Sequence, residues 1–133
     1  MTRVILGLCC DRGTPLKTLQ TAIEQALAQA GLGLDAVTGA ATIDRKGDEE
    51  ALLQLVQQHG WPLQLFSAEQ LAQVTVPNPS EVVRKFMGTP AVSEAAALLA
   101  AGGGLDDLLV EKHKHRGHDG KNATVSIARM INE

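Results

Sequence analysis

The stretch VILGLCCDRGTP, residues 4–15, decides how the rest of the chain is interpreted. Its apolar, partly β-branched first half is typical of a strand that is buried on both faces of a sheet. Thr14 and Pro15 are typical of an N-cap and a first helical position. Apolar residues at spacings of three and four follow, until Gly31 ends the pattern. The stretch therefore predicts a strand at residues 4–8, followed directly by an amphipathic helix.

A strand followed by a helix recurs further along the chain. We expect strands at residues 37–43 and 63–66, with a helix between them that Asp48 caps. Ser67 opens another short helix with a capping box. Such an alternation of strands and helices is typical of a parallel sheet that is covered by helices.

The second half of the chain departs from this alternation. Residues 75–104 contain the signals of two successive helices, and residues 108–110 and 123–128 are typical of two strands joined by a polar turn. The predicted fold class is therefore α/β. We expect a three-layer α/β/α arrangement with a mainly parallel mixed sheet and a C-terminal antiparallel hairpin. Residues 1–133 are expected to form a single domain.

The composition excludes several classes of function. Aromatic residues make up 2% of the 133 residues and the net charge is −3, so an extended nucleic-acid surface is not expected. No apolar run approaches the roughly 20 residues that a membrane-spanning helix needs. The N-terminus lacks the pattern of a signal peptide, so we expect a cytoplasmic protein without a membrane or nucleic-acid partner.

Charged residues follow the first two predicted strands. Arg12 comes after the first strand, and Asp44, Lys46, Asp48 and Glu49 come after the second. The carboxyl ends of parallel strands meet at one edge of a sheet, where ligands bind in open α/β folds. Helix N-termini at this edge also favour anions. The two loops therefore predict a ligand-binding edge, and the alternative is a pair of ordinary charged loops.

Cys9 and Cys10 are adjacent, so their side chains are expected on opposite faces of the strand. This spacing is not that of a C-x-x-C redox motif, which favours a packing role. The alternative is a reactive Cys10 whose pKa is lowered by the helix N-terminus that follows it.

Three of the four histidines gather near the predicted hairpin turn, namely His113, His115 and His118. Imidazoles two residues apart on a strand face can bind a metal such as zinc or nickel, which makes a metal-delivery module one hypothesis. A solvated hairpin tip is the alternative.

Lys112 and Lys114 are expected on the opposite face from the histidines, continuing the side of Val110. There they could present ammonium groups to an anionic ligand.

Taken together, these stretches resemble the CobE family, which corresponds to the C-terminal part of CbiG in cobalamin biosynthesis. The resemblance covers about residues 3–129. It is carried, in order, by VILGLCCDRGT, ATIDRKGDEEAL, VPNPSEVV, GTPAVSEAAALLAA, and LLVEKHKH before ATVSIAR.

The resemblance implies a three-layer α/β/α domain that acts on precursors of the corrin ring. CbiG-type proteins open the lactone of a cobalt-precorrin and release a two-carbon fragment, and they carry an additional N-terminal region. We expect this chain to be the stand-alone CobE type of the aerobic pathway instead. A hydrolase or lyase activity on a cobalt-precorrin is the alternative, with Asp44, Asp48, Glu49 or Glu94 as acid–base groups.

A precorrin carries several carboxylates around a flat apolar ring, so its site needs spaced cationic and amide donors. We expect a precorrin or corrinoid ligand, other cobalamin-biosynthesis enzymes as partners, and no resident cofactor or metal. The candidate ligand-binding residues are Arg12, Gly13, Thr14, Asp44, Lys46, Asp48, Glu49, Asn78, Ser80, Glu94 and Lys112.

Overall fold

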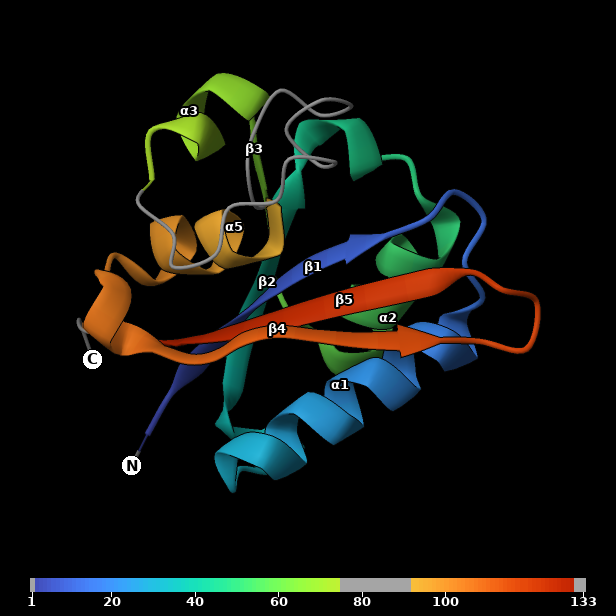
Figure 1. The fold of residues 1–133 in the computed structure, drawn as a ribbon, viewed down its shortest axis with the longest axis horizontal. Coiled ribbons are helices and arrows are strands. Elements are labelled where there is room, and N and C mark those ends of the chain that lie inside the picture. Colours follow the sequence, from blue (N-terminus) through green and yellow to red (C-terminus); the bar gives the residue numbers. More distant parts are fainter. Residues whose placement is uncertain (1, 75–91, 131–133) are drawn as a thin grey trace.

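The structure is a computed structural model that describes residues 2–74 and 92–130. Its five-stranded sheet has the order β3-β2-β1-β5-β4 (Figure 1). β1, β2 and β3 run parallel, whereas β5 pairs antiparallel with both β1 and β4. The strands are β1 (Val4–Cys10), β2 (Val37–Ile43), β3 (Leu63–Phe66), β4 (Leu108–Arg116) and β5 (Asn122–Arg129). The predicted α/β fold with a C-terminal antiparallel hairpin is confirmed.

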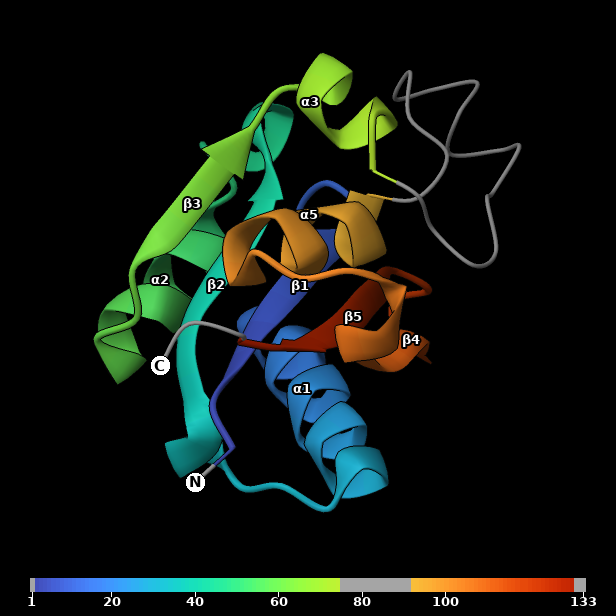
Figure 2. The ribbon, with the colours of Figure 1, turned by 90° about the vertical axis from the view of Figure 1, so that its left-hand side faces the viewer.

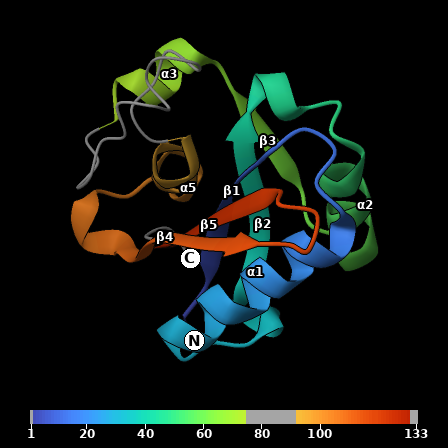
Figure 3. The same ribbon diagram turned by 45° about the vertical axis from the view of Figure 1, so that its right-hand side comes forward.

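Helices cover both faces of this sheet (Figure 2). One face packs against α1 (Leu16–Ala30) and α2 (Glu50–His59), and the other packs against α5 (Val92–Ala101) and α3 (Ala68–Ala72). Short 3-10 turns occupy Leu34–Ala36, Asp44–Lys46 and Leu105–Asp107. Figure 3 shows α1 and α5 on opposite sides of β1 and β5. None of the described helices is long and apolar enough to cross a membrane.

β1 is apolar throughout because it is central and is covered on both sides. Leu6 and Leu8 belong to the core beneath α1 and α2. Ile5 belongs to the core beneath α5, and Cys9 packs against that core. The continuous apolar run at the start of the chain is thus explained by two separate cores that share one strand.

Gly7 allows α5 to approach β1 closely. A Cβ atom at this position would lie 1.8 Å from the backbone oxygen of Ser93 and 2.9 Å from the Cβ of Ala97. Only a residue without a side chain leaves room for the first turn of the helix here. Gly7 therefore sets where the N-terminal end of α5 lies over the sheet.

Two sequence-based boundaries differ from the structure at the start of α1. Pro15 is the N-cap residue, and the helix begins at Leu16. The Thr14 hydroxyl does not cap the helix but donates a hydrogen bond to the backbone oxygen of Asp11, at 2.6 Å. Residues 11–14 therefore form a hydrogen-bonded turn before the helix begins. The expected capping box at Ser67 is confirmed.

β4 is longer than predicted and contains an irregularity. It extends to Arg116, and its register against β5 shifts between Val110 and His113. Val110 lies in the core beneath α1, whereas Lys112 reaches Glu94 on α5. The prediction that Lys112 continues the side of Val110 is therefore wrong, because the extra residue in the bulge exchanges the two faces.

Candidate functional site

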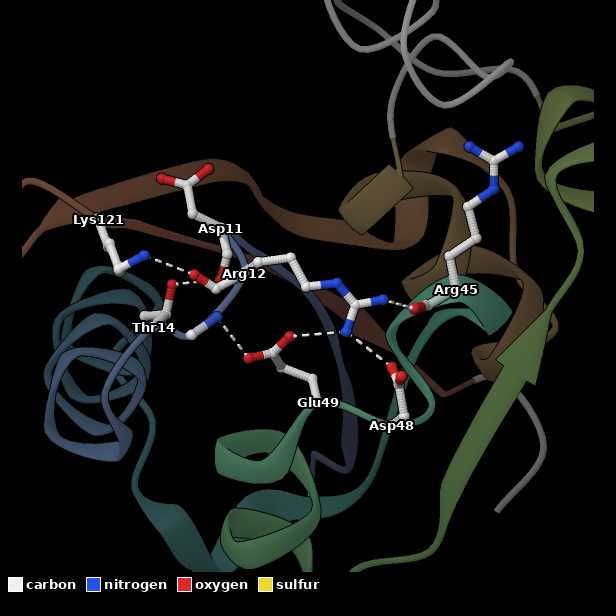
Figure 4. Close-up of polar contacts among 8 residues, drawn as sticks. Asp11, Arg12, Thr14, Arg45, Asp48, Glu49 and Lys121 are labelled. Carbon is white, nitrogen blue, oxygen red and sulfur yellow. Dashed lines mark hydrogen bonds and ion pairs between the residues drawn. The ribbon is translucent and has the colours of Figure 1, made fainter.

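The two predicted charged loops meet at the carboxyl edge of the sheet (Figure 4). Arg12, after β1, donates hydrogen bonds from Nη1 to Asp48 Oδ1 at 2.7 Å and to Glu49 Oε2 at 3.1 Å. Its Nη2 donates to the backbone oxygen of Arg45 at 2.6 Å. Glu49 also accepts a hydrogen bond from the backbone N–H of Gly13, at 2.8 Å. We call this set of contacts the loop network.

The turn between β4 and β5 joins the same network. Lys121 Nζ donates to the backbone oxygen of Arg12 at 2.7 Å. Asp11 Oδ2 accepts from the backbone N–H of Asn122 at 2.8 Å. Three segments that are distant in the sequence are thus held together at one edge. Lys121 was not predicted, because its partner is a backbone oxygen whose position only the fold reveals.

The contacts of the loop network change the expected role of its members. Asp48 is not the cap of α2, because Glu49 occupies that position without a side-chain cap. Asp48 pairs instead with Arg12, and the hydrogen bond and the positive charge of Arg12 lower the pKa of this carboxyl. Glu49 is almost fully buried, with 5% of its side chain exposed, whereas 59% of the Arg12 side chain stays exposed. These groups satisfy one another, so the network orders the loops.

Two lysines of β4 lie on the α5 side of the sheet, and a third, Lys46, follows β2 at its carboxyl edge. Lys46 is 4% exposed, and its positive charge acts on both cysteine thiols. No hydrogen bond or ion pair joins its side chain to another residue of the described ranges. Lys114 lies in one row with Thr124 and Cys9 across β4, β5 and β1, and its charge also acts on Cys9. With Lys112, two residues away on β4, these residues form what we call the lysine cluster, Lys46, Lys112 and Lys114.

Glu94 lies in the first turn of α5 and contacts this cluster. Its side chain is completely buried, and its Oε1 lies 3.4 Å from the Nζ of Lys112, whose side chain is 23% exposed. Within residues 2–74 and 92–130, neither carboxylate oxygen of Glu94 has a hydrogen-bond partner. Burial raises the pKa of this carboxyl, and the charge of Lys112 partly offsets the increase. Ser93 beside it hydrogen-bonds to Ser126 of β5, at 2.9 Å between the two hydroxyl oxygens.

The cysteines are packing residues in this environment. Cys9 faces the α5 core and Cys10 faces the opposite core, as predicted. Burial raises the pKa of both thiols, that of Cys10 to about 11. The alternative of a reactive Cys10 is therefore wrong, because the loss of solvation outweighs the effect of the nearby positive charge.

The histidines do not converge on a common centre. His113 faces α1, where its Nδ1 lies 2.7 Å from Gln29 Nε2 and its Nε2 lies 2.6 Å from Gln25 Oε1. Across residues 2–74 and 92–130, no three side chains of the kinds that bind metals lie close enough to share an ion. The described residues therefore give no support to the metal-delivery hypothesis.

The other predicted site residues fall in different places. Asp44 is exposed at the start of the turn before α2, outside the loop network. Asn78 and Ser80 lie outside the described residues. The structure thus brings Lys112 together with Glu94, and Arg12 together with Asp48 and Glu49.

A hollow that the sequence did not predict lies on the opposite side of the sheet. Its volume is about 250 Å³, and it lies between α1 and α2. The rings of His59 and Trp61, which line it, are stacked with their centroids 4.3 Å apart. It is separated from the lysine cluster by the sheet.

Comparison with known proteins gives a consistent result. Residues 4–128 match the sequence model of the family described as "Cobalamin synthesis G C-terminus". The chain is 33% identical over 123 residues to a cobalt-precorrin-5A hydrolase of Priestia megaterium, a match that covers 92% of this chain and 31% of that protein. It is 36% identical over 101 residues to protein CobE of a Sinorhizobium species, covering 74% of this chain and 66% of that protein. The chain thus spans less than two thirds of these relatives.

A solved structure is similar over a larger part of its length. The crystal structure of CobE, a protein from the cobalamin biosynthetic pathway, superposes with a TM-score of 0.83 at 32% sequence identity. The match covers 99% of this chain and 93% of that chain.

Proposed function

The chain belongs to the CbiG C-terminal family as a CobE-type cobalamin biosynthesis protein, and we propose that it binds a precorrin or corrinoid intermediate. The ligand is recognised through the carboxylates around its ring. The proposed site lies at the carboxyl edge of the sheet, on the side of α5. As a carrier, the protein passes its ligand to other enzymes of the same pathway.

The lysine cluster is the observation that carries this proposal. Lys46 and Lys114 come from different segments of the chain, yet their charges act on the same thiol, that of Cys9. Lys114 lies on β4 and Lys46 follows β2, which are three strand spacings apart in the sheet, or roughly 14 Å. Ammonium groups spaced over such a width match a ligand with several separated carboxylates better than a single small anion.

The burial of Lys46 supports the same proposal. Burying a lysine is unfavourable unless its ammonium group keeps contact with water or with a partner. Lys46 is 4% exposed as a residue and follows β2 directly, at the edge where ligands bind in this class of fold. Among the described residues its side chain has no hydrogen bond or ion pair, and we propose that a ligand carboxylate pairs with it.

The loop network has a supporting role in this proposal. Arg12 contacts Glu49 and the backbone oxygen of Arg45, which holds the turn that contains Lys46 against the loop after β1. We therefore propose that Arg12, Gly13, Asp48 and Glu49 position the site, and that Lys46, Lys112 and Lys114 contact the ligand.

Hydrolysis of a cobalt-precorrin is the second candidate function. It is favoured by Glu94, a buried carboxyl beside a lysine, which is a common arrangement for an acid–base group. The Priestia megaterium relative is named a cobalt-precorrin-5A hydrolase. We favour binding without turnover, because the side chain of Glu94 is completely buried and exposes no atom to a substrate.

A pair of matched probes tests this proposal. The purified protein is titrated with cobyrinic acid, a corrinoid with free carboxylates, and with its fully methylated ester, and the absorbance of the ring is followed. We expect saturable binding of the acid that weakens at high salt, and much weaker binding of the ester. Equal binding of acid and ester would show that carboxylates are not recognised. Conversion of a cobalt-precorrin to a hydrolysed product would favour the second candidate.

A further inference from the structure

Glu94 is the one acidic group of the described residues that is completely buried beside the lysine cluster. Its position raises the question of why a site for an anionic ligand contains a carboxylate. Two features favour the ionised form of Glu94, namely the ammonium of Lys112 at 3.4 Å and the location in the first turn of α5. Two features oppose it, namely the complete burial and the absence of a hydrogen bond from any described residue to either oxygen.

Lys112 lies between Glu94 and solvent. The side chain of Lys112 is 23% exposed, whereas that of Glu94 is not exposed at all. An incoming anion can therefore contact Lys112 but not Glu94. Lys114, two residues further along β4, is exposed and lies on the same face. A carboxylate that binds between these two lysines has to share Lys112 with Glu94.

We propose that Lys112 and Lys114 form the subsite for one carboxylate of the ligand, and that this carboxylate displaces Glu94 from Lys112. On this proposal, which rests on the proposed function, Glu94 takes up one proton from solvent as the ligand binds. The ligand carboxylate stays ionised, Lys112 keeps its charge, and Glu94 becomes a neutral carboxylic acid.

Electrostatics supports the uptake of a proton. Two carboxylates that share one site do not both remain ionised when one of them is buried. Among the described residues, the titratable groups that act on Glu94 are Lys112 and Glu111, both from β4, while Ser93 and Ser126 contribute hydroxyls. The charge of Glu111 already disfavours ionisation of Glu94. Once the ligand competes for Lys112, the location in the first turn of α5 is the one feature of the described residues named above that still favours the ionised form.

The consequence is ligand binding that weakens as the pH rises. A site that takes up one proton on binding loses affinity by up to about tenfold per pH unit above the pKa of the free carboxyl. The same linkage means that the bound ligand raises the pKa of Glu94 further. Release of the ligand is therefore favoured where the pH is higher, or where a partner neutralises Lys112.

The experiment compares the wild type with Glu94→Gln and Glu111→Gln, using cobyrinic acid as the probe between about pH 5 and pH 8. Glutamine keeps the shape of the side chain without its charge, and circular dichroism checks the fold of each variant. We expect the affinity of the wild type to fall with pH, and that of Glu94→Gln to change little and to exceed the wild type at high pH. Glu111→Gln, which removes the same charge from an exposed neighbouring position, is expected to retain the slope of the wild type, with the fall in affinity moved to lower pH because the charge of Glu111 raises the pKa of Glu94. Calorimetry in buffers with different ionisation enthalpies should detect proton uptake by the wild type that Glu94→Gln lacks.

The possible failures are distinguishable. Binding of the probe with the same pH dependence in the wild type and in Glu94→Gln would overturn this inference and leave the proposed function intact. Weaker binding by Glu94→Gln at every pH would also overturn it, because Glu94 would then contribute its negative charge to the site. No binding of the probe by the wild type or by Glu94→Gln at any pH would overturn the proposed function, and this inference with it.

Discussion

Replacing Gly7 with alanine is expected to destabilise the protein by about 1–3 kcal/mol, the usual range for an overpacked core. The added Cβ would lie 1.8 Å from the backbone oxygen of Ser93, and real Cβ atoms essentially never come closer than 3.0 Å to such a neighbour. α5 therefore has to move away from β1 by more than 1 Å. No side-chain rotation relieves this contact, because the opposing atom belongs to the backbone of the helix.

Urea unfolding measures this cost, and Gly104→Ala is the matched control. Gly104 is exposed, and a Cβ atom there would meet nothing within 4 Å. We expect the control to unfold at the wild-type midpoint or slightly above it, since alanine restricts the unfolded chain. If Gly7→Ala unfolded at the same urea concentration as Gly104→Ala, the close approach of α5 to β1 would be refuted.

Three further results follow from the loop network and the thiols. Glu49→Ala is expected to lower the free energy of unfolding by about 1.5–3 kcal/mol, because it leaves the Gly13 N–H without its charged acceptor. Asp48→Ala, at an exposed position of the same network, should leave the urea midpoint unchanged, and an equal effect of the two variants would contradict this assignment. The thiol of Cys10, with a pKa of about 11, is expected to resist alkylation by iodoacetamide at pH 8 until the protein is unfolded. Rapid modification of the folded protein would contradict the burial of this residue.

The apolar run of β1 and the helix that follows it could be predicted because local sequence and tertiary environment agree there. For β4, the face of the sheet on which each side chain lies could not be predicted for every residue. The bulge between Val110 and His113 depends on pairing with β5. The alternating pattern of a regular strand does not predict where such a bulge occurs. Lys112 consequently lies opposite Val110 and contacts α5.

The charged loops illustrate the same limit at the candidate site. The sequence located Arg12 and Glu49 at the carboxyl edge of the sheet, since strand order and loop position follow from the alternation of elements. It did not reveal that these residues bind each other, because they lie 37 positions apart. The burial of Lys46 and of Glu94 was also not predictable, since it depends on how the elements around them pack together.

Affinity for cobyrinic acid in single lysine variants tests the central claim most directly. Lys46→Ala, Lys112→Ala and Lys114→Ala are compared with Lys17→Ala, which removes an exposed lysine from α1 on the other face of the sheet. A charge-assisted hydrogen bond contributes about 1.5–3 kcal/mol, so each cluster variant should bind roughly tenfold to a hundredfold more weakly. The loss should diminish at high salt, and Lys17→Ala should bind like the wild type. If Lys17→Ala weakened binding as much as the cluster variants, the ligand would be responding to overall charge, and the site on the α5 side would be contradicted.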